Sequence, residues 1–163
     1  NKYYNIKMKK KIFSFLIFLF LSSCGYEALY SEKNQINYNF SISELILNGD
    51  REVNLKIKEK LNNYILDKKD KTFRLRISSN SKKIIIAKNR VGNATNFKIE
   101  ITVDMEVLKN NGLKSNFVII ESFDYSNKSD KFELKSYEKE IKNNLSNIVS
   151  DKLKLRLSNI RWS

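Results

Sequence analysis

The feature that most constrains the fold is a strict alternation of apolar and polar residues over 97–107. Successive side chains of a β-strand point to opposite faces, so this alternation predicts a strand with one buried and one solvated face. The same period of two runs over 73–78 and resumes at 84–86. An apolar segment at 117–125 follows the turn signal Asn110-Asn111-Gly112, which predicts an antiparallel hairpin.

Two other segments carry the period of amphipathic helices. The first follows a predicted strand at 40–47, and Asp50 is its predicted N-cap. The second follows Asp130, with Glu133 three residues later, which is the spacing of a capping box. The predicted apolar stripes are Val53, Ile57, Leu61, Tyr64 and Ile65 in the first helix and Leu134, Tyr137, Ile141, Leu145 and Ile148 in the second.

The predicted element order is β-α-β-β-β-α. Each helix has one apolar stripe and the sheet has one apolar face. Packing the helices on that face buries all of these apolar side chains. We therefore predict an α+β, two-layer fold in which two amphipathic helices pack on one face of a four-stranded sheet. A chain of 163 residues without a Pro-rich or Gly/Ser-rich linker favours one domain, which we expect at 39–163.

The segment 8–24 has the three parts of a secretory signal. Met8 precedes three lysines, then a mostly apolar run over 12–21, and then small residues. This run is shorter than the roughly 20 residues that a membrane-spanning helix needs. We expect 1–23 to be a signal peptide, with Met8 as the true start, and 24–38 to be a tether.

The sequence Leu21-Ser22-Ser23-Cys24 resembles the lipobox of bacterial lipoproteins. In that class the thiol is diacylglycerylated, the chain is cleaved before the cysteine, and the new N-terminus is usually acylated. Three acyl chains exceed the two signals that stable membrane anchoring requires. The alternative is a buried cysteine beside an uncleaved anchor. Gly25 follows the cysteine instead of Asp, which by the same resemblance favours sorting to the outer membrane.

The composition lacks the residues that most catalytic and metal sites need. The chain has no His and a single Cys, so the commonest general base and Cys-based zinc sites are both excluded. No nucleophile elbow and no Gly-rich phosphate loop is present. We therefore expect no enzymatic activity, no metal and no cofactor other than the covalent lipid at Cys24.

The charge balance favours anionic partners. Five of the 31 basic residues and none of the 18 acidic residues precede Cys24, which leaves +8 of the total charge of +13 for the rest of the chain. Such a charge suits phosphorylated lipid, an acidic membrane surface or nucleic acid. Nucleic-acid binding requires a cytoplasmic chain that keeps 1–23, so we do not expect it. A lysine-rich genomic composition would produce the same excess without any function.

The segment 24–30, Cys-Gly-Tyr-Glu-Ala-Leu-Tyr, resembles the Cys-Gly-Phe-x-Pro-Leu-Tyr start of the LptE family of lipopolysaccharide-assembly lipoproteins, in its alphaproteobacterial type. The element order is also similar, as are Gly49-Asp50-Arg51 before the first helix and 122–125 before the last. Ala28 stands where the family has Pro. The resemblance covers 24 to about 161. It implies a non-enzymatic outer-membrane lipoprotein that plugs the LptD β-barrel and assists lipopolysaccharide transport, with its domain in the periplasm or the barrel lumen.

The resemblance also implies lipopolysaccharide binding through basic side chains near a strand-connecting loop. Lys and Arg suit this role because they pair with phosphate, Arg in bidentate fashion. The alternative for each residue is a solvated charge that protects a sheet edge. The alternative function is a lipoprotein adaptor or pilot of another envelope complex, which shares the anchor but has no barrel partner. The candidate residues are Lys82, Lys83, Lys88 and Arg90 around the turn at 89–93 and, as a second set on the outward face of their strand, Arg74 and Arg76.

Overall fold

The computed structural model describes residues 38–65, 69, 71–109, 112 and 114–160, which all belong to one compact unit, Tyr38–Ser163. The predicted signal peptide, Cys24 and the tether up to residue 37 lie outside these described residues. Tyr38 belongs to the folded unit, with its ring centroid 6.3 Å from that of Phe40.

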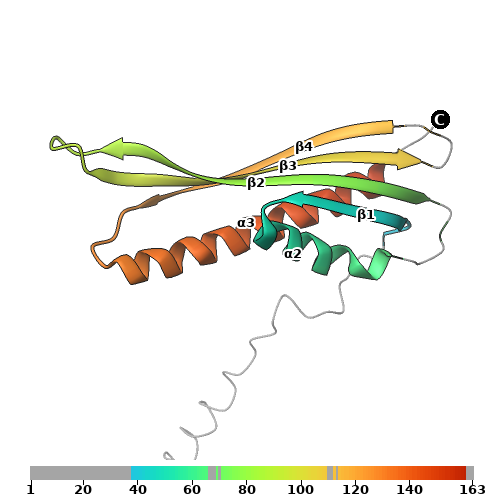
Figure 1. Cartoon of the computed structure of the whole chain (residues 1–163), viewed down its shortest axis with the longest axis horizontal. Helices are drawn as coiled ribbons and strands as arrows, with labels where there is room; N and C mark the ends of the chain where they lie inside the picture. The colour runs from blue at the N-terminus through green and yellow to red at the C-terminus, as the bar shows by residue number, and fades with distance from the viewer. Residues whose placement is uncertain (1–37, 66–68, 70, 110–111, 113, 161–163) are drawn as a thin grey trace, which may run out of the picture. The chain divides into compact units, whose positions relative to one another are not determined.

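The elements follow the predicted order, and both helices lie on the same face of the sheet (Figure 1). The strand order in the sheet is β1-β2-β3-β4. Strands β2, β3 and β4 pair antiparallel through short hairpins, whereas β1 and β2 are parallel because α2 connects them as a crossover. The predicted α+β two-layer fold is confirmed. The elements are β1 (Ser41–Gly49), α2 (Arg51–Leu61) with the 3-10 turn η2 (Asn62–Tyr64), β2 (Thr72–Lys88), β3 (Ala94–Lys109), β4 (Lys114–Ser126) and α3 (Lys131–Asn159).

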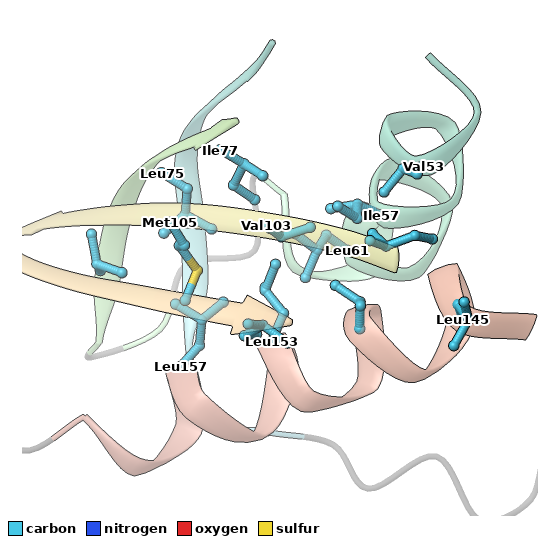
Figure 2. Close-up of a cluster of buried hydrophobic side chains, with 14 of the residues drawn as sticks. Val53, Ile57, Leu61, Leu75, Ile77, Val103, Met105, Leu145, Leu153 and Leu157 are labelled. Carbon is cyan, nitrogen blue, oxygen red and sulfur yellow. The ribbon is translucent and has the colours of Figure 1, made fainter. Parts of the chain in front are cut away.

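The core fills the space between the two layers. Every second residue of β3 from Phe97 to Val107 is buried, as the alternation predicts. The helices bring their apolar stripes against this face, and Figure 2 shows α2 and α3 side chains packed beside the strands. The buried residues labelled there are Val53, Ile57 and Leu61 of α2, Leu145, Leu153 and Leu157 of α3, and Leu75, Ile77, Val103 and Met105 of the sheet.

Both helices begin at the predicted aspartates. Asp50 Oδ1 accepts hydrogen bonds from the backbone N–H groups of Glu52 and Val53, at 3.0 and 3.2 Å. Asp130 Oδ1 accepts from the N–H groups of Phe132 and Glu133, at 2.7 and 3.0 Å. Each carboxylate satisfies two of the four N–H groups that a helix start leaves without an intrahelical partner. The Glu133 carboxylate accepts a hydrogen bond from Lys128 Nζ.

Two details of the predicted helices were wrong. The α-helical part of α2 ends at Leu61, and Ile65 is extended and forms an isolated parallel bridge with Ile42. In α3, Ile148 is 43% exposed and Val149 is fully buried. The buried stripe passes through Val149 because it continues at spacings of four residues after Leu145, on a side that also contains serines. None of the helices in the described ranges is long and apolar enough to cross a membrane.

Candidate ligand-binding surface

The turn between β2 and β3 projects two side chains away from the domain. Asn89 organises this turn: its N–H donates to the carbonyl of Asn93 at 2.9 Å, and its Oδ1 accepts from the N–H groups of Val91 and Asn93. Gly92 adopts a φ of 87°, a conformation that glycine takes without strain. Arg90 and Val91 are exposed on this fixed turn. We call residues 88–93 the hairpin tip.

The first set of predicted basic residues does not form one patch. All four are exposed, but Lys82 and Lys83 are adjacent in a strand and so point to opposite faces of the sheet. A strand rises about 3.3 Å per residue, which places Lys82 roughly 20 Å from Lys88 along β2. Only Lys88 and Arg90 therefore belong to the hairpin tip.

Lys83 has a structural role. Its Nζ lies 2.5 Å from Glu138 Oε1 of α3 and 4.0 Å from the ring centroid of Phe97. Tyr125 donates its hydroxyl to the same carboxylate oxygen at 2.8 Å. Burial and, after it, the hydrogen bond to Glu138 raise the pKa of Tyr125, which keeps this hydroxyl a donor. The pair joins β2 to α3, so the Lys83 ammonium is already engaged.

The second predicted set lies far from the hairpin tip. Arg74 and Arg76 are exposed on the outer face, by which we mean the sheet face opposite the helices. Arg76 is roughly 40 Å from Lys88 along the strand, and its guanidinium lies 3.3 Å from Glu106. Lys114 also pairs with Glu106, and its hydrogen bond is the main cause that lowers the pKa of that carboxyl.

The outer face carries charges of both signs, and the apolar side chains of Ile84, Val118 and Ile120 are exposed among them. A hollow of about 370 Å³ lies on it, lined by residues that include Arg76, Asp104 and Val118. The positive excess of the chain is therefore not concentrated on this face. From the strand registers, its charged residues outside the hairpin tip are Arg74, Arg76, Lys82, Lys98 and Lys114 against Glu44, Glu100, Asp104, Glu106 and Asp124.

The structure adds basic residues that the sequence prediction missed. The first turns of α3, which contain Lys131 and Lys135, lie at the same end of the domain as the hairpin tip (Figure 1). Both lysines are exposed. Their spacing of four residues can be seen in the sequence. Only the packing of α3 beneath the hairpin shows that these two lysines lie at the same end of the domain as the basic residues of the hairpin tip. No group of acidic residues suited to a metal ion occurs in the described part of the chain.

Comparison of the sequence with protein-family models and with curated proteins gave no match. Comparison with solved structures found the rare lipoprotein B from Shewanella oneidensis, at 19% sequence identity and a TM-score of 0.54, covering 70% of this chain and 92% of that chain. It also found a minor lipoprotein from Acinetobacter baumannii, at 13% identity and a TM-score of 0.54, covering 74% and 91%. This chain has the fold of these two lipoproteins.

Proposed function

We propose that this chain is an outer-membrane lipoprotein, acylated at Cys24, that acts in lipopolysaccharide assembly. Its domain plugs the lumen of an LptD-type β-barrel, and it has no enzymatic activity. The observation that carries this proposal is the combination of a lipobox in the sequence with a fold shared by two lipoproteins over more than nine-tenths of their length.

The outer face of the sheet suits a barrel lumen. Outer-membrane barrels have polar interiors, and a plug must present polar and charged groups of both signs to such a wall. The outer face offers alternating charges, some already paired across strands, such as Lys98 with Asp124 at 3.7 Å. Strand β2 has 17 residues, which corresponds to a span of roughly 55 Å. This length exceeds the roughly 30 Å hydrocarbon core of a bilayer.

The hairpin tip suits the phosphate groups of a glycolipid. Lys88 and Arg90 are exposed there and form no ion pair with any other described residue. Arg90 can contact a phosphate in bidentate fashion, and Lys88 contributes a point charge. Lys131 and Lys135 at the start of α3 lie at the same end of the domain, where the carboxylates of Asp130 and Glu133 offset part of their charge.

Depletion of the protein from its native host tests this function. The expected result is a loss of lipopolysaccharide from the cell surface, with rescue by the wild-type chain and failure of rescue by Cys24→Ala. Mass spectrometry of the purified protein is expected to show a chain that begins with an acylated Cys24. Normal surface lipopolysaccharide after depletion would contradict the assembly role. A mature chain that retains 1–23 and an unmodified thiol would contradict the lipoprotein assignment itself.

A further inference from the structure

Half of β2 lies at an open edge of the sheet. Pairing between β1 and β2 ends at Gly49 and Ser79, but β2 continues to Lys88 (Figure 1). Asp50, just after β1, makes the last contacts along this edge: its N–H donates to the carbonyl of Ser79 at 3.0 Å, and Ser81 Oγ donates to its Oδ2 at 2.5 Å. From Lys82 onward, no described strand pairs with β2 on the side away from β3.

From Ser79 to Ile85 this edge presents backbone hydrogen-bonding groups in a regular order, and the β2–β3 register shifts between Ile85 and Ala87 and again between Ala87 and Lys88. The carbonyl of Ser79 points away from β3, toward β1, because it accepts from Asp50. In a regular strand the backbone groups of residues two apart point to the same side. The β2–β3 register shows no shift between Ser79 and Ile85. The N–H and C=O groups of Lys83 and Ile85 therefore point outward from the edge, where an added strand would bind them.

The side chains along the edge are apolar at the centre and basic at the ends. Ile84, Ile85 and Ile86 are consecutive and are 38%, 50% and 42% exposed. Lys82 and Lys88 flank them, and neither forms an ion pair with another described residue. Glu100 is the cross-strand neighbour of Lys82, but it lies on β3, on the side away from the edge.

We propose that the edge Lys82–Lys88 binds an extended segment of a partner protein as an additional strand, and that this segment is apolar at its centre and acidic at its ends. In such β-augmentation the main-chain hydrogen bonds supply affinity and the side chains supply specificity. Aspartate or glutamate beside Lys82 and Lys88 forms favourable cross-strand pairs, and apolar residues cover the three isoleucines. This inference goes beyond the lipid and barrel partners proposed above and does not depend on them, although the acidic segment and a lipid phosphate would compete for Lys88.

Charge disfavours a second copy of this chain as the occupant. In a symmetric antiparallel pair centred on Ile85, Lys82 of one copy would lie opposite Lys88 of the other. In a parallel pair in register, each lysine would lie opposite itself. Like charges directly opposite each other destabilise a sheet, so both arrangements are disfavoured.

A short peptide tests the proposal on the full mature protein. The probe is the acetylated and amidated heptapeptide Asp-Glu-Val-Ile-Val-Thr-Asp, and the readout is binding together with amide hydrogen exchange followed by NMR. In the free protein, the amides of Lys83 and Ile85 are expected to exchange rapidly, whereas those of Lys82 and Ile84 are protected by β3. Bound peptide is expected to slow exchange at Lys83 and Ile85. Affinity is expected to fall as salt rises.

Two matched controls separate backbone pairing from simple charge attraction. A peptide methylated at its three central backbone nitrogens keeps its charges and side chains but loses the N–H donors at the centre of the peptide, on both of its edges. It is expected to bind at least ten-fold more weakly. The variant Ile85→Pro removes an outward N–H, which an edge strand tolerates. It is expected to lose more affinity than Ile85→Ala, which keeps that N–H.

Three results would overturn the proposal. These are no binding of the unmethylated peptide, equal binding of the methylated peptide, or protection confined to amides outside Lys82–Lys88. Concentration-dependent dimerisation that protects Lys83 and Ile85 without any peptide would show instead that the occupant is a second copy. If Ile85→Pro does not fold, the methylated peptide still decides the question on the wild-type protein.

Discussion

Lys142 Nζ in α3 lies 2.8 Å from Asp50 Oδ2 at the start of α2. The same ammonium lies 2.8 Å from Glu52 Oε2, and the Asp50 carboxylate also caps α2 and accepts from Ser81 of β2. One carboxylate thus connects both helices and the sheet. Burial alone would raise the pKa of Asp50, but the hydrogen bonds from Lys142, Ser81 and the backbone of Val53 together lower it to about 2.

This pKa predicts a loss of stability in acid. Because folding lowers the pKa of Asp50 from 3.8 to about 2, the unfolded state binds the proton more tightly than the folded state. The stabilisation is therefore fully present above about pH 4 and is lost as pH falls toward 2. We expect Asp50→Asn to cost roughly 1–2 kcal/mol at pH 7 and to flatten the pH dependence between these limits. Urea unfolding from pH 7 to pH 2 measures both.

Asp50→Ala is the matched control for this change. Asn retains the N-cap function of Asp, whereas Ala removes both the charge and the cap, so Asp50→Ala is expected to cost about 1 kcal/mol more. Equal stability of the wild type and Asp50→Asn at every pH would show that the ion pair with Lys142 contributes nothing.

Gly49 is predicted to be the least replaceable glycine of the described chain. Its φ is 95°, and a Cβ atom there would lie only 1.9 Å from the carbonyl oxygen of Ser79. Gly49→Ala therefore has to displace β1 from β2, and we expect a loss above about 3 kcal/mol. Gly92 has a similar φ of 87° but no atom near the added Cβ, so Gly92→Ala is expected to cost only about 1 kcal/mol. Similar thermal unfolding of both variants would contradict the close approach at Gly49.

Lys83 is predicted to contribute to the stability of the domain, and Arg90 to contribute to lipopolysaccharide binding. A double-mutant cycle of Lys83→Met and Glu138→Gln is expected to show a coupling of about 0.5–1 kcal/mol, because the pair is partly exposed. Arg90→Ala is expected to change stability by less than about 0.5 kcal/mol. The expected effects on lipopolysaccharide binding are the opposite of those on stability. Arg90→Ala is expected to weaken the affinity several-fold, and Lys83→Met is expected to change it less than two-fold. If Lys83→Met binds lipopolysaccharide more weakly and its stability is unchanged, Lys83 belongs to the lipid-binding residues after all.

Alanine variants of two neighbouring residues are predicted to show which side of α3 faces the core. Val149 is fully buried, and Val149→Ala is expected to cost about 2 kcal/mol. Ile148 is 43% exposed, and Ile148→Ala is expected to change stability by less than about 0.5 kcal/mol. Denaturant unfolding of both variants measures the difference. The opposite order would mean that α3 is rotated relative to the orientation described above.

Local features of this fold are readable from the sequence, and non-local ones are not. The alternation over 97–107 and the caps at Asp50 and Asp130 are determined by residues a few positions apart, so the strands and helix starts were predicted correctly. The buried side of α3 near Ile148 was predicted wrongly, because Ser146 and Ser150 lie on that side and interrupt the apolar pattern. Both hydroxyls donate to carbonyls one turn earlier, which satisfies them there.

The grouping of the candidate basic residues in space could not be predicted from the sequence for the same reason. Sequence proximity grouped Lys82 with Lys83, but strand geometry separates them onto two faces. The partner of Lys83 is Glu138, 55 residues away, and no local pattern indicates it. The open edge beyond Ser79 also depends on where β1 ends relative to β2, which is a property of strand pairing and not of either strand alone.

We propose that this chain works inside an outer-membrane barrel during lipopolysaccharide assembly. Purification of the tagged protein from its native envelope in mild detergent, followed by mass spectrometry of everything that remains bound, would identify its partners. We expect a stoichiometric large β-barrel that carries lipopolysaccharide. An acylated protein recovered without a barrel, or with the components of another envelope complex, would contradict it and favour an adaptor or pilot function.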